Sequence, residues 1–344
     1  MEKMSNYKCK SYVALQGNKD PFKYITLGKR IEEMGYDRIY VYDDLPYYPS
    51  WPILSLIAEH TKNIEVGPCI VSGLHSHPIR IARNAIFLNR LSRGRLVLGI
   101  GKGAFFDLIG IEYLKGEAKK ACIETIKYIR RILQDDSSNY SGKYFYKAKS
   151  LKVIQNNSIN NFPIILGSFS EEMAYFGGQY CDEFQTGENW DLTALKKLYT
   201  KLELGSKLSN RATPHFSIGG ITCISRNVNR AYDMVRPILA MYIPYMKSIV
   251  SNCDFPLSKR EFEKIIFYVK RDDVKKATSY ISNEIVSYCA LVGCPEDVID
   301  KLKLLSNNIY IYGISFGPPY GTQGDILKDI RFIKDEVISE LLLW

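Results

Sequence analysis

The chain has 344 residues, of which 46% are hydrophobic and 24% are charged, an ordinary composition for a globular protein with a sizeable core. No apolar run approaches the roughly 20 residues that a membrane helix needs, and the N-terminus MEKMSNYKCK lacks the apolar core of a signal peptide, so we expect a cytoplasmic protein without a membrane partner. The formal charge of +9 comes from Lys and Arg spread along the chain, without a basic run or a nucleic-acid motif, so we expect no nucleic-acid partner.

Strand-like and helix-like segments alternate through the first part of the chain. KSYVAL at residues 10–15 is predicted to be a strand, and residues 21–34 a helix that ends at Gly35. Three further pairs follow, with strands at 37–42, 63–71 and 95–101 and helices at 50–61, 78–91 and 119–133. Pro78 stands at the first position of its predicted helix, where a missing amide costs nothing.

The rest of the chain supplies four more strands and a long helical stretch. The strands are predicted at residues 163–167, 181–187, 216–225 and 309–316, with helices at 170–177 and 191–207. Residues 226–290 are too long for one barrel helix, and we expect a helical insertion before the last unit, with helices at 226–250, 256–270 and 274–291. Eight strands that alternate with helices imply parallel units. The predicted fold class is therefore α/β, a (β/α)8 TIM barrel in a single domain over residues 1–344.

The segment RLVLGIGKGA places Gly99, Gly101 and Ala104 in the spacing G-x-G-x-x-A of a dinucleotide-binding loop. A Rossmann unit begins its domain with this loop and continues directly into a helix. Here three strands come first, and about fifteen residues separate Ala104 from the next helix, which excludes the dinucleotide fold. At the carboxyl end of a barrel strand, glycines instead let a flat or phosphorylated ligand approach the backbone, with Lys102 as a nearby cation. A turn packed tightly for its own sake is the alternative.

The cysteines and histidines show no metal-binding pattern. The eight cysteines contain no C-x-x-C pair, and the four histidines have no metal-ligand spacing. We therefore expect reduced, buried thiols and no metal site. The frequent Lys, Ile and Tyr residues are typical of a thermophilic or archaeal protein.

Four blocks of sequence, taken together, carry a family resemblance. They are RIEEMGYDRIYVYDD; LIAEHTKNIEVGPCIV with HPIRIARNAIFLNRLSRGRLVLGIGKG; PIILGSFSEEMAYFGGQYCDEF; and LVGCPEDVIDKLKLL with NIYIYGISFGPP. The chain resembles the luciferase-like superfamily of flavin-dependent monooxygenases and coenzyme F420-dependent oxidoreductases. FFDLIGIEY and the GPC and GPP segments are most similar to methylenetetrahydromethanopterin reductase-like members. The resemblance implies an eight-stranded barrel with an isoalloxazine ring at the carboxyl ends of its strands.

The resemblance implies that two loops bind the cofactor. Lys102, between Gly101 and Gly103, matches a basic position that contacts the flavin phosphate in luciferase. A second loop, which enters a helix and holds the cofactor tail, is matched by Gly167, Ser168, Phe169 and Ser170. Ser170 is suited to a helix N-cap, and a helix N-terminus attracts phosphate.

The acidic residues that follow this second loop complicate its assignment. Glu171 and Glu172 already complement the helix dipole and would repel an anion. A well-capped helix without a ligand is therefore the alternative interpretation of SFSEE.

The chain departs from the family pattern after the second strand, where the family carries an Asp-His pair close to the ring. Asp43 and Asp44 stand there, so a carboxylate replaces the histidine, and Asp43 is expected in the cofactor site. Asp44 becomes a catalytic acid if burial beside Asp43 raises its pKa. Otherwise both aspartates only bind backbone amides. His75 in SGLHSHP is the second catalytic candidate, whereas His77 orients its loop.

The segment GPCIV matches a bulge that deazaflavin members of the family press against the back of the ring. The match predicts a non-prolyl cis peptide between Cys69 and Ile70, with both residues at the cofactor. The alternative is a regular strand, in which these two side chains alternate between the barrel interior and the helices.

Three functions are compatible with these residues. The first is an oxidoreductase that transfers hydride between coenzyme F420 and a small organic substrate, supported by the reductase-like blocks. The second is an FMN-dependent luciferase-like monooxygenase, supported by Lys102, and the third is a catalytically degenerate flavin-binding barrel, supported by the missing histidine. The expected partners are a small-molecule substrate and a second copy of the chain in a homo-oligomer, a dimer.

Overall fold

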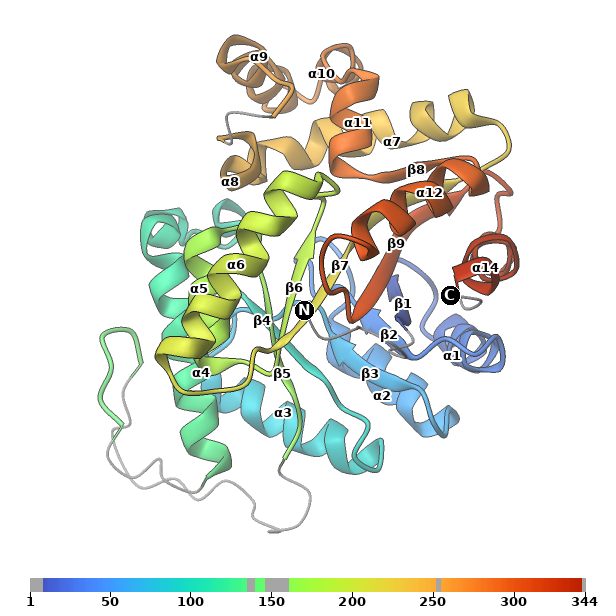
Figure 1. Ribbon diagram of the computed structural model, residues 1–344. Coiled ribbons are helices and arrows are strands. Elements are labelled where there is room, and N and C mark those ends of the chain that lie inside the picture. The colour runs from blue at the N-terminus through green and yellow to red at the C-terminus, as the bar shows by residue number, and fades with distance from the viewer. Residues whose placement is uncertain (1–8, 135–139, 146–160, 252–254, 342–344) are drawn as a thin grey trace.

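Eight parallel strands form a barrel. The computed structural model describes residues 9–134, 140–145, 161–251 and 255–341 (Figure 1). The barrel strands are β1 (Lys10–Leu15), β2 (Arg38–Val41), β3 (Glu65–Pro68), β4 (Leu98–Gly101), β5 (Ile164–Gly167), β6 (Glu183–Gly187), β7 (His215–Ile224) and β9 (Gly313–Gly321). Their order in the sheet is β3-β2-β1-β9-β7-β6-β5-β4. Isolated parallel bridges between Val66 and Leu96 and between Val71 and Ile100 bring β3 beside β4. The predicted (β/α)8 TIM barrel is confirmed.

Helices connect the strands and cover the outside of the barrel (Figure 1). They are α1 (Lys23–Glu33), α2 (Ser50–His60), α3 (Pro78–Leu91), α4 (Ala118–Leu133), α5 (Glu171–Tyr180), α6 (Leu192–Leu208), α12 (Pro295–Ser306) and α13 (Ile326–Ile333), followed by α14 (Ser339–Leu341). As predicted, α3 begins at Pro78. His77 precedes it, and its ring Nδ1 accepts a hydrogen bond from the Ile79 amide at 3.2 Å. His77 therefore has a structural role at the start of this helix.

The predicted helical insertion lies between β7 and α12, at one end of the molecule (Figure 1). Its helices are α7 (Val228–Tyr242), α8 (Lys247–Val250), α9 (Lys259–Val269), α10 (Val274–Thr278) and α11 (Asn283–Cys289). The prediction of one helix over residues 274–291 is wrong. Ser282 interrupts it, because its Oγ accepts from the Ile285 amide at 3.3 Å and caps α11. Leu291–Gly293 then form a short strand, β8, which pairs with β7 outside the barrel.

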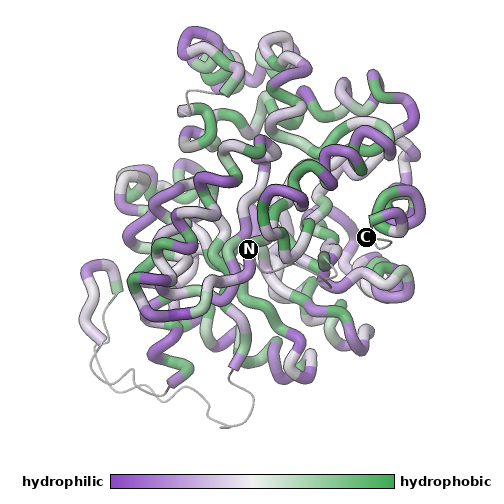
Figure 2. Tube along the Cα trace, in the orientation of Figure 1, coloured by the Kyte–Doolittle hydropathy of each residue, from purple (hydrophilic) through white to green (hydrophobic). Residues whose placement is uncertain are grey.

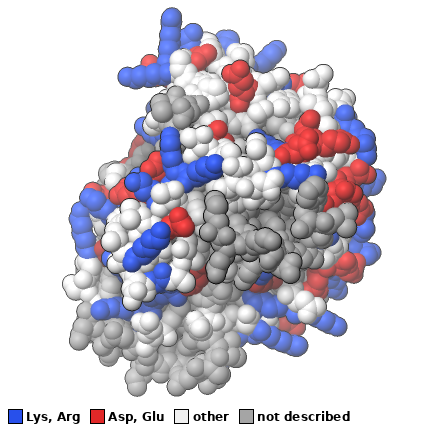
Figure 3. Space-filling view, in the orientation of Figure 1, with Lys and Arg blue, Asp and Glu red and all other residues white. Residues whose placement is uncertain are grey.

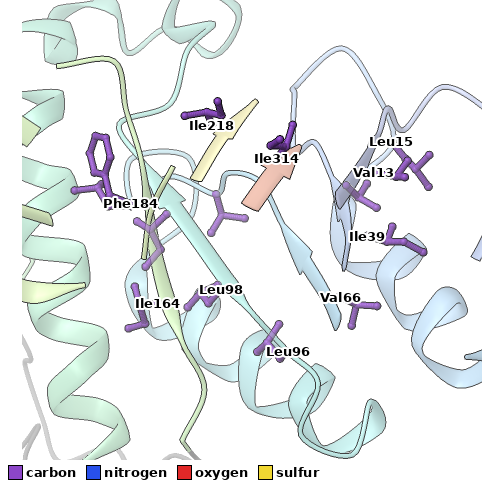
Figure 4. Close-up of a cluster of buried hydrophobic side chains, with 14 of the residues drawn as sticks. Val13, Leu15, Ile39, Val66, Leu96, Leu98, Ile164, Phe184, Ile218 and Ile314 are labelled. Carbon is purple, nitrogen blue, oxygen red and sulfur yellow. The ribbon is translucent and has the colours of Figure 1, made fainter. Parts of the chain in front are cut away.

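The main hydrophobic core lies between the outer face of the barrel and the helices. Alternate residues of each strand point toward it (Figure 4), among them Val13, Ile39, Val66, Leu98, Ile164, Phe184, Ile218 and Ile314. Figure 2 shows hydrophobic residues gathered along the inner strands and hydrophilic residues on the outer turns of the helices. This burial stabilises the barrel wall from which the strand ends project.

The barrel interior is polar at the end where the strands begin. The Arg38 guanidinium is 2% exposed, and its Nη1 lies 3.1 and 3.0 Å from the two oxygens of Glu183. Its Nε donates to Glu65 at 2.7 Å, and Nη1 also donates to the Tyr40 hydroxyl at 2.6 Å. The guanidinium carbon lies 4.2 Å from the centre of the Tyr12 ring. These contacts fill one end of the barrel and leave the carboxyl ends of the strands for a ligand.

The described residues contain no helix that is long and apolar enough to cross a membrane. Nor do they place three or more His, Cys, Asp or Glu side chains where these could hold a metal ion. The seven cysteines of the described ranges are free thiols, and Cys253 lies outside those ranges. Burial was predicted for all of them, but Cys9, Cys69 and Cys294 are only half-buried. Figure 3 shows Lys and Arg interspersed with Asp and Glu over the visible face rather than gathered in one patch.

Candidate functional site at the carboxyl ends of the strands

The ends of β3, β4 and β5 meet around the side chain of Ile70. The Cys69–Ile70 peptide after β3 is cis, as predicted. A Cβ on Gly101 would lie 2.8 Å from Ile70 Cγ1, and a Cβ on Gly167 would lie 2.5 Å from Ile70 Cγ2. Only glycine therefore fits at these two positions without displacing Ile70. The structure brings these predicted cofactor-binding residues together, and Cys69 packs beside them against the barrel interior.

The loop after β3 packs against the turn after β4. Ser72 Oγ donates to the backbone oxygen of Lys102 at 3.0 Å. Gly103 has a φ of +82°, and a Cβ there would lie 3.0 Å from His75 Cε1. The His75 ring meets Phe106 edge to face, with 5.4 Å between ring centres, and its buried Nε2 has no partner among the described residues. Burial lowers the pKa of His75, so the imidazole is neutral at pH 7 and lacks the acidic proton of an imidazolium.

Asp43 and Asp44 differ in their surroundings. Asp43 Oδ1 accepts a hydrogen bond of 2.8 Å from the amide of Ser50, the first residue of α2. Asp43 therefore makes the backbone-amide contact that the alternative interpretation gave to both aspartates. The Asp44 carboxyl has no hydrogen bond from the described part of the chain, and burial, followed by the charge of Asp43, raises its pKa to about 6. Asp44 thus meets the condition stated for a catalytic acid.

Glu188 is a third acidic residue at the strand ends, after Asp43 and Asp44, and the sequence reasoning missed it. It follows β6 directly and adopts a φ of +44°, with its amide donating to the Gly219 oxygen at 3.1 Å. Burial and then the charge of Asp44 raise the pKa of Glu188 to about 7. The position of Glu188 in the sequence could have indicated a site residue, because residues that directly follow barrel strands lie on the active face.

The helical insertion reaches the same end of the barrel. Tyr242, the last residue of α7, forms a side-chain hydrogen bond with Gln16, and the charge of Asp44 adds to the effect of burial in raising the pKa of Tyr242. In a 3-10 turn that follows α7, Tyr245 packs its ring against Phe105, with 5.0 Å between ring centres. No local sequence pattern indicates these contacts, because they depend on how the insertion folds back.

The loop after β5 lacks the helix cap that was predicted for Ser170. Ser170 stands at the start of α5, but its side chain does not cap the helix. Its Oγ instead accepts a hydrogen bond of 3.0 Å from Lys119 Nζ, which also pairs with Glu172 at 2.9 Å. Ser168 Oγ accepts from the Ser170 amide at 3.3 Å, and the Phe169 ring lies 3.6 Å from a Cβ on Gly187. Lys119, which the sequence reasoning missed, therefore offsets part of the negative charge at this helix start.

Comparisons with known proteins place the chain in a family with this fold. The model of the luciferase-like monooxygenase family matches residues 11–309. The 5,10-methylenetetrahydromethanopterin reductase of Methanopyrus kandleri is 22% identical over 334 residues, which cover 92% of this chain and 94% of that reductase.

Solved structures show the same fold. The coenzyme F420 dependent tetrahydromethanopterin reductase from Methanopyrus kandleri superposes with a TM-score of 0.82 at 21% identity, over 97% of this chain and 99% of that one. The oxygenating constituent of 3,6-diketocamphane monooxygenase from Pseudomonas putida, solved with FMN, gives a TM-score of 0.69 at 17% identity, over 97% and 99% of the two chains. With the family model matching most of its length, the chain belongs to the luciferase-like monooxygenase family.

Proposed function

We propose that this protein is an oxidoreductase that transfers hydride between coenzyme F420 and a small organic substrate. The observation that carries the proposal is the packing of Ile70 on Gly101 and Gly167 at the strand ends. The charge of the half-buried Asp44 acts on Cys69, the residue that precedes Ile70. The Methanopyrus kandleri reductase, whose structure is described as coenzyme F420 dependent, supports this choice of cofactor. So does the F420-dependent glucose-6-phosphate dehydrogenase of Amycolatopsis mediterranei, which matches about half of the chain.

The residues at the strand ends fit a planar ring with a polar edge. Gly101 and Gly167 leave room for the Ile70 side chain, which adds an apolar surface at the strand ends. Gln185 points into the barrel interior, on the same side of β6 as Glu183, and its Oε1 is buried without a partner among the described residues. The His75 Nε2 atom is in the same situation. Two buried polar atoms without partners are suited to hydrogen bonds with a ligand.

The chain's own residues would hold the ring and provide a proton. When bound, the reduced cofactor supplies the hydride. We propose that Lys102, Ser168 and Lys119 hold its anionic part, because cations and hydroxyl groups bind phosphate and carboxylate oxygens. Asp44 is the proposed acid, since its pKa of about 6 keeps a usable fraction protonated near neutral pH. Asp43 positions the loop through the Ser50 amide, and its charge supports the raised pKa of Asp44.

A direct test of this proposal titrates the protein separately with coenzyme F420 and with FMN and monitors binding by the fluorescence of each cofactor. We expect coenzyme F420 to bind and FMN to bind more weakly.

The second candidate function, an FMN-dependent monooxygenase, is favoured by Lys102, because an ammonium suits the terminal phosphate of FMN. Binding of FMN alone would replace our proposal with that function, and binding without any turnover would indicate a degenerate barrel.

Replacing Lys102 with Glu is expected to weaken cofactor binding by about 10- to 100-fold, because a charge-assisted hydrogen bond contributes about 1.5–3 kcal/mol and repulsion is added. The dissociation constant from the fluorescence titration measures this change. Lys29→Glu, on the exposed face of α1, makes the same charge change and serves as the control. Equal cofactor affinities in Lys102→Glu and Lys29→Glu would show that Lys102 is not part of the binding site.

A further inference from the structure

The side chain of Gln185, in the middle of β6, points into the barrel interior. Its neighbour Phe184 belongs to the main core outside the barrel, and Thr186 is registered against Ile218, which lies in the same core. Because successive side chains of a strand point to opposite faces, Gln185 shares the inner face with Glu183. Gln185 is 7% exposed, so its carboxamide is removed from solvent near the carboxyl end of the strand.

The residues on either side of Gln185 do not hydrogen-bond to its carboxamide oxygen. In the sheet, Gln185 lies between Gly167 of β5 and Ser217 of β7. Gly167 has no side chain, and the apolar side chain of Ile70 occupies the space beside it. The Ser217 hydroxyl donates to Glu183 instead. Gln185 Oε1 is buried without a partner among the described residues.

The backbone of Gln185 also contacts the candidate cofactor site. Its carbonyl oxygen accepts a hydrogen bond of 3.0 Å from the amide of Ser168, in the loop after β5. Gln185 therefore lies between the loop proposed to hold the anionic part of the cofactor and the apolar surface of Ile70. A buried amide oxygen without a partner lowers the stability of the folded chain. Its position beside Ile70 indicates that a ligand supplies its hydrogen bond.

We propose that the Gln185 carboxamide binds the pyrimidine edge of the cofactor ring. The inference rests on the proposed function, which places the ring against Ile70. The pyrimidine edge carries an N–H group between two carbonyl groups, and a carboxamide offers an acceptor and an N–H donor side by side, so the two can form a paired contact. Flavins and deazaflavins share this edge. Gln185 therefore contributes equally to the binding of both, and selection between them depends on other residues.

The test measures ring binding without enzymatic activity. The ligands are riboflavin and its deazaflavin counterpart from coenzyme F420, which carry the ring and the ribityl chain without a phosphate. Each is titrated into the original protein and into Gln185→Met and is followed by its fluorescence. Met has about the length of Gln but no carboxamide, so we expect the dissociation constant of each ligand to rise about 10-fold.

Thr186→Val provides the matched control. Thr186 is also buried, and its Oγ1 also has no partner among the described residues, but it lies on the opposite face of β6. The control therefore removes a comparable polar atom from the same strand and should leave both affinities unchanged. Urea denaturation checks that both variants fold, and Gln185→Leu replaces Gln185→Met if the latter does not.

The outcomes separate this inference from the proposed function. Equal ring affinities in Gln185→Met and Thr186→Val overturn the inference. If both rings bind the original protein and Gln185→Met weakens only one of them, the inference is also overturned, because the pyrimidine edge is common to both. If the protein binds FMN but not coenzyme F420, the proposed function fails, and riboflavin still tests Gln185. If the original protein binds neither ring, both fail.

Discussion

Replacing Asp44 with Asn is expected to lower turnover by about 100-fold or more while leaving cofactor affinity unchanged. Asn has nearly the same shape as Asp but cannot release a proton at any accessible pH. The Asp44 side chain forms no hydrogen bond with the described residues, so the substitution breaks no hydrogen bond. Single-turnover kinetics with a saturating reduced cofactor would measure the loss, and the binding titration would check the affinity.

The pH dependence of stability gives Asp44→Asn a second readout. Burial and Asp43 raise the pKa of Asp44 to about 6, above the value of about 4 for an unfolded aspartate. The folded protein therefore binds the Asp44 proton more tightly than the unfolded chain does. Above pH 6 the ionised carboxylate lowers the free energy of unfolding, and below about pH 4 this loss of stability disappears. Asp44→Asn should accordingly be more stable than the original protein above pH 6 and equally stable at pH 4. Turnover retained in Asp44→Asn would show that Asp44 is a structural residue and not the acid.

Replacing Glu183 with Ala is expected to lower the free energy of unfolding by about 3–5 kcal/mol, because it leaves the buried Arg38 charge without its main partner. Arg38 and Glu183 are 2% and 3% exposed at their side chains and lie 3.0 Å apart. Ser217 Oγ also donates to Glu183 Oε1, so a second buried polar group loses its partner. The loss is a large share of the roughly 5–15 kcal/mol that stabilises a typical domain.

The chain offers a matched control for this stability prediction. Arg30 and Glu33 on α1 form the same kind of pair at 2.8 Å, but both side chains are 57% exposed. Glu33→Ala should cost less than about 1 kcal/mol, since exposed ion pairs contribute little. Urea denaturation compares the two variants directly. Similar small losses in both would show that Arg38 is compensated by other groups, such as Glu65.

The fold could be predicted from the sequence wherever local signals were strong. All eight barrel strands were predicted, and α3 was predicted with both of its boundaries because Pro78 marks its start. The error at residues 274–291 has a physical cause. β8 has three residues, too few to show the alternation that identifies a strand, and the cap at Ser282 lies within an otherwise helical pattern.

The candidate site was only partly predictable. Ile70, Gly101 and Gly167 were predicted through the family resemblance, and the structure brings them together. The effect of the Asp44 charge on Glu188 could not be predicted from sequence, because β2 and β6 face each other across the barrel only when the barrel closes. Tyr242 was missed for the same reason, since its place depends on packing between the insertion and the barrel.

The pairing of β8 with β7 holds the two ends of the helical insertion close together, so the insertion can be replaced by another segment. Ile224 is registered against Gly293, and the Ser225 amide donates to the Gly293 oxygen at 3.0 Å. The segment of residues 226–293 therefore leaves β7 and returns beside it, with its two ends about one strand spacing apart, ~4.8 Å. Because loop closure depends only weakly on length, segments of very different size can be grafted between these two points. Such grafts would replace Tyr242 and Tyr245, whereas the loops that carry Ile70 and Asp44 would stay in the barrel.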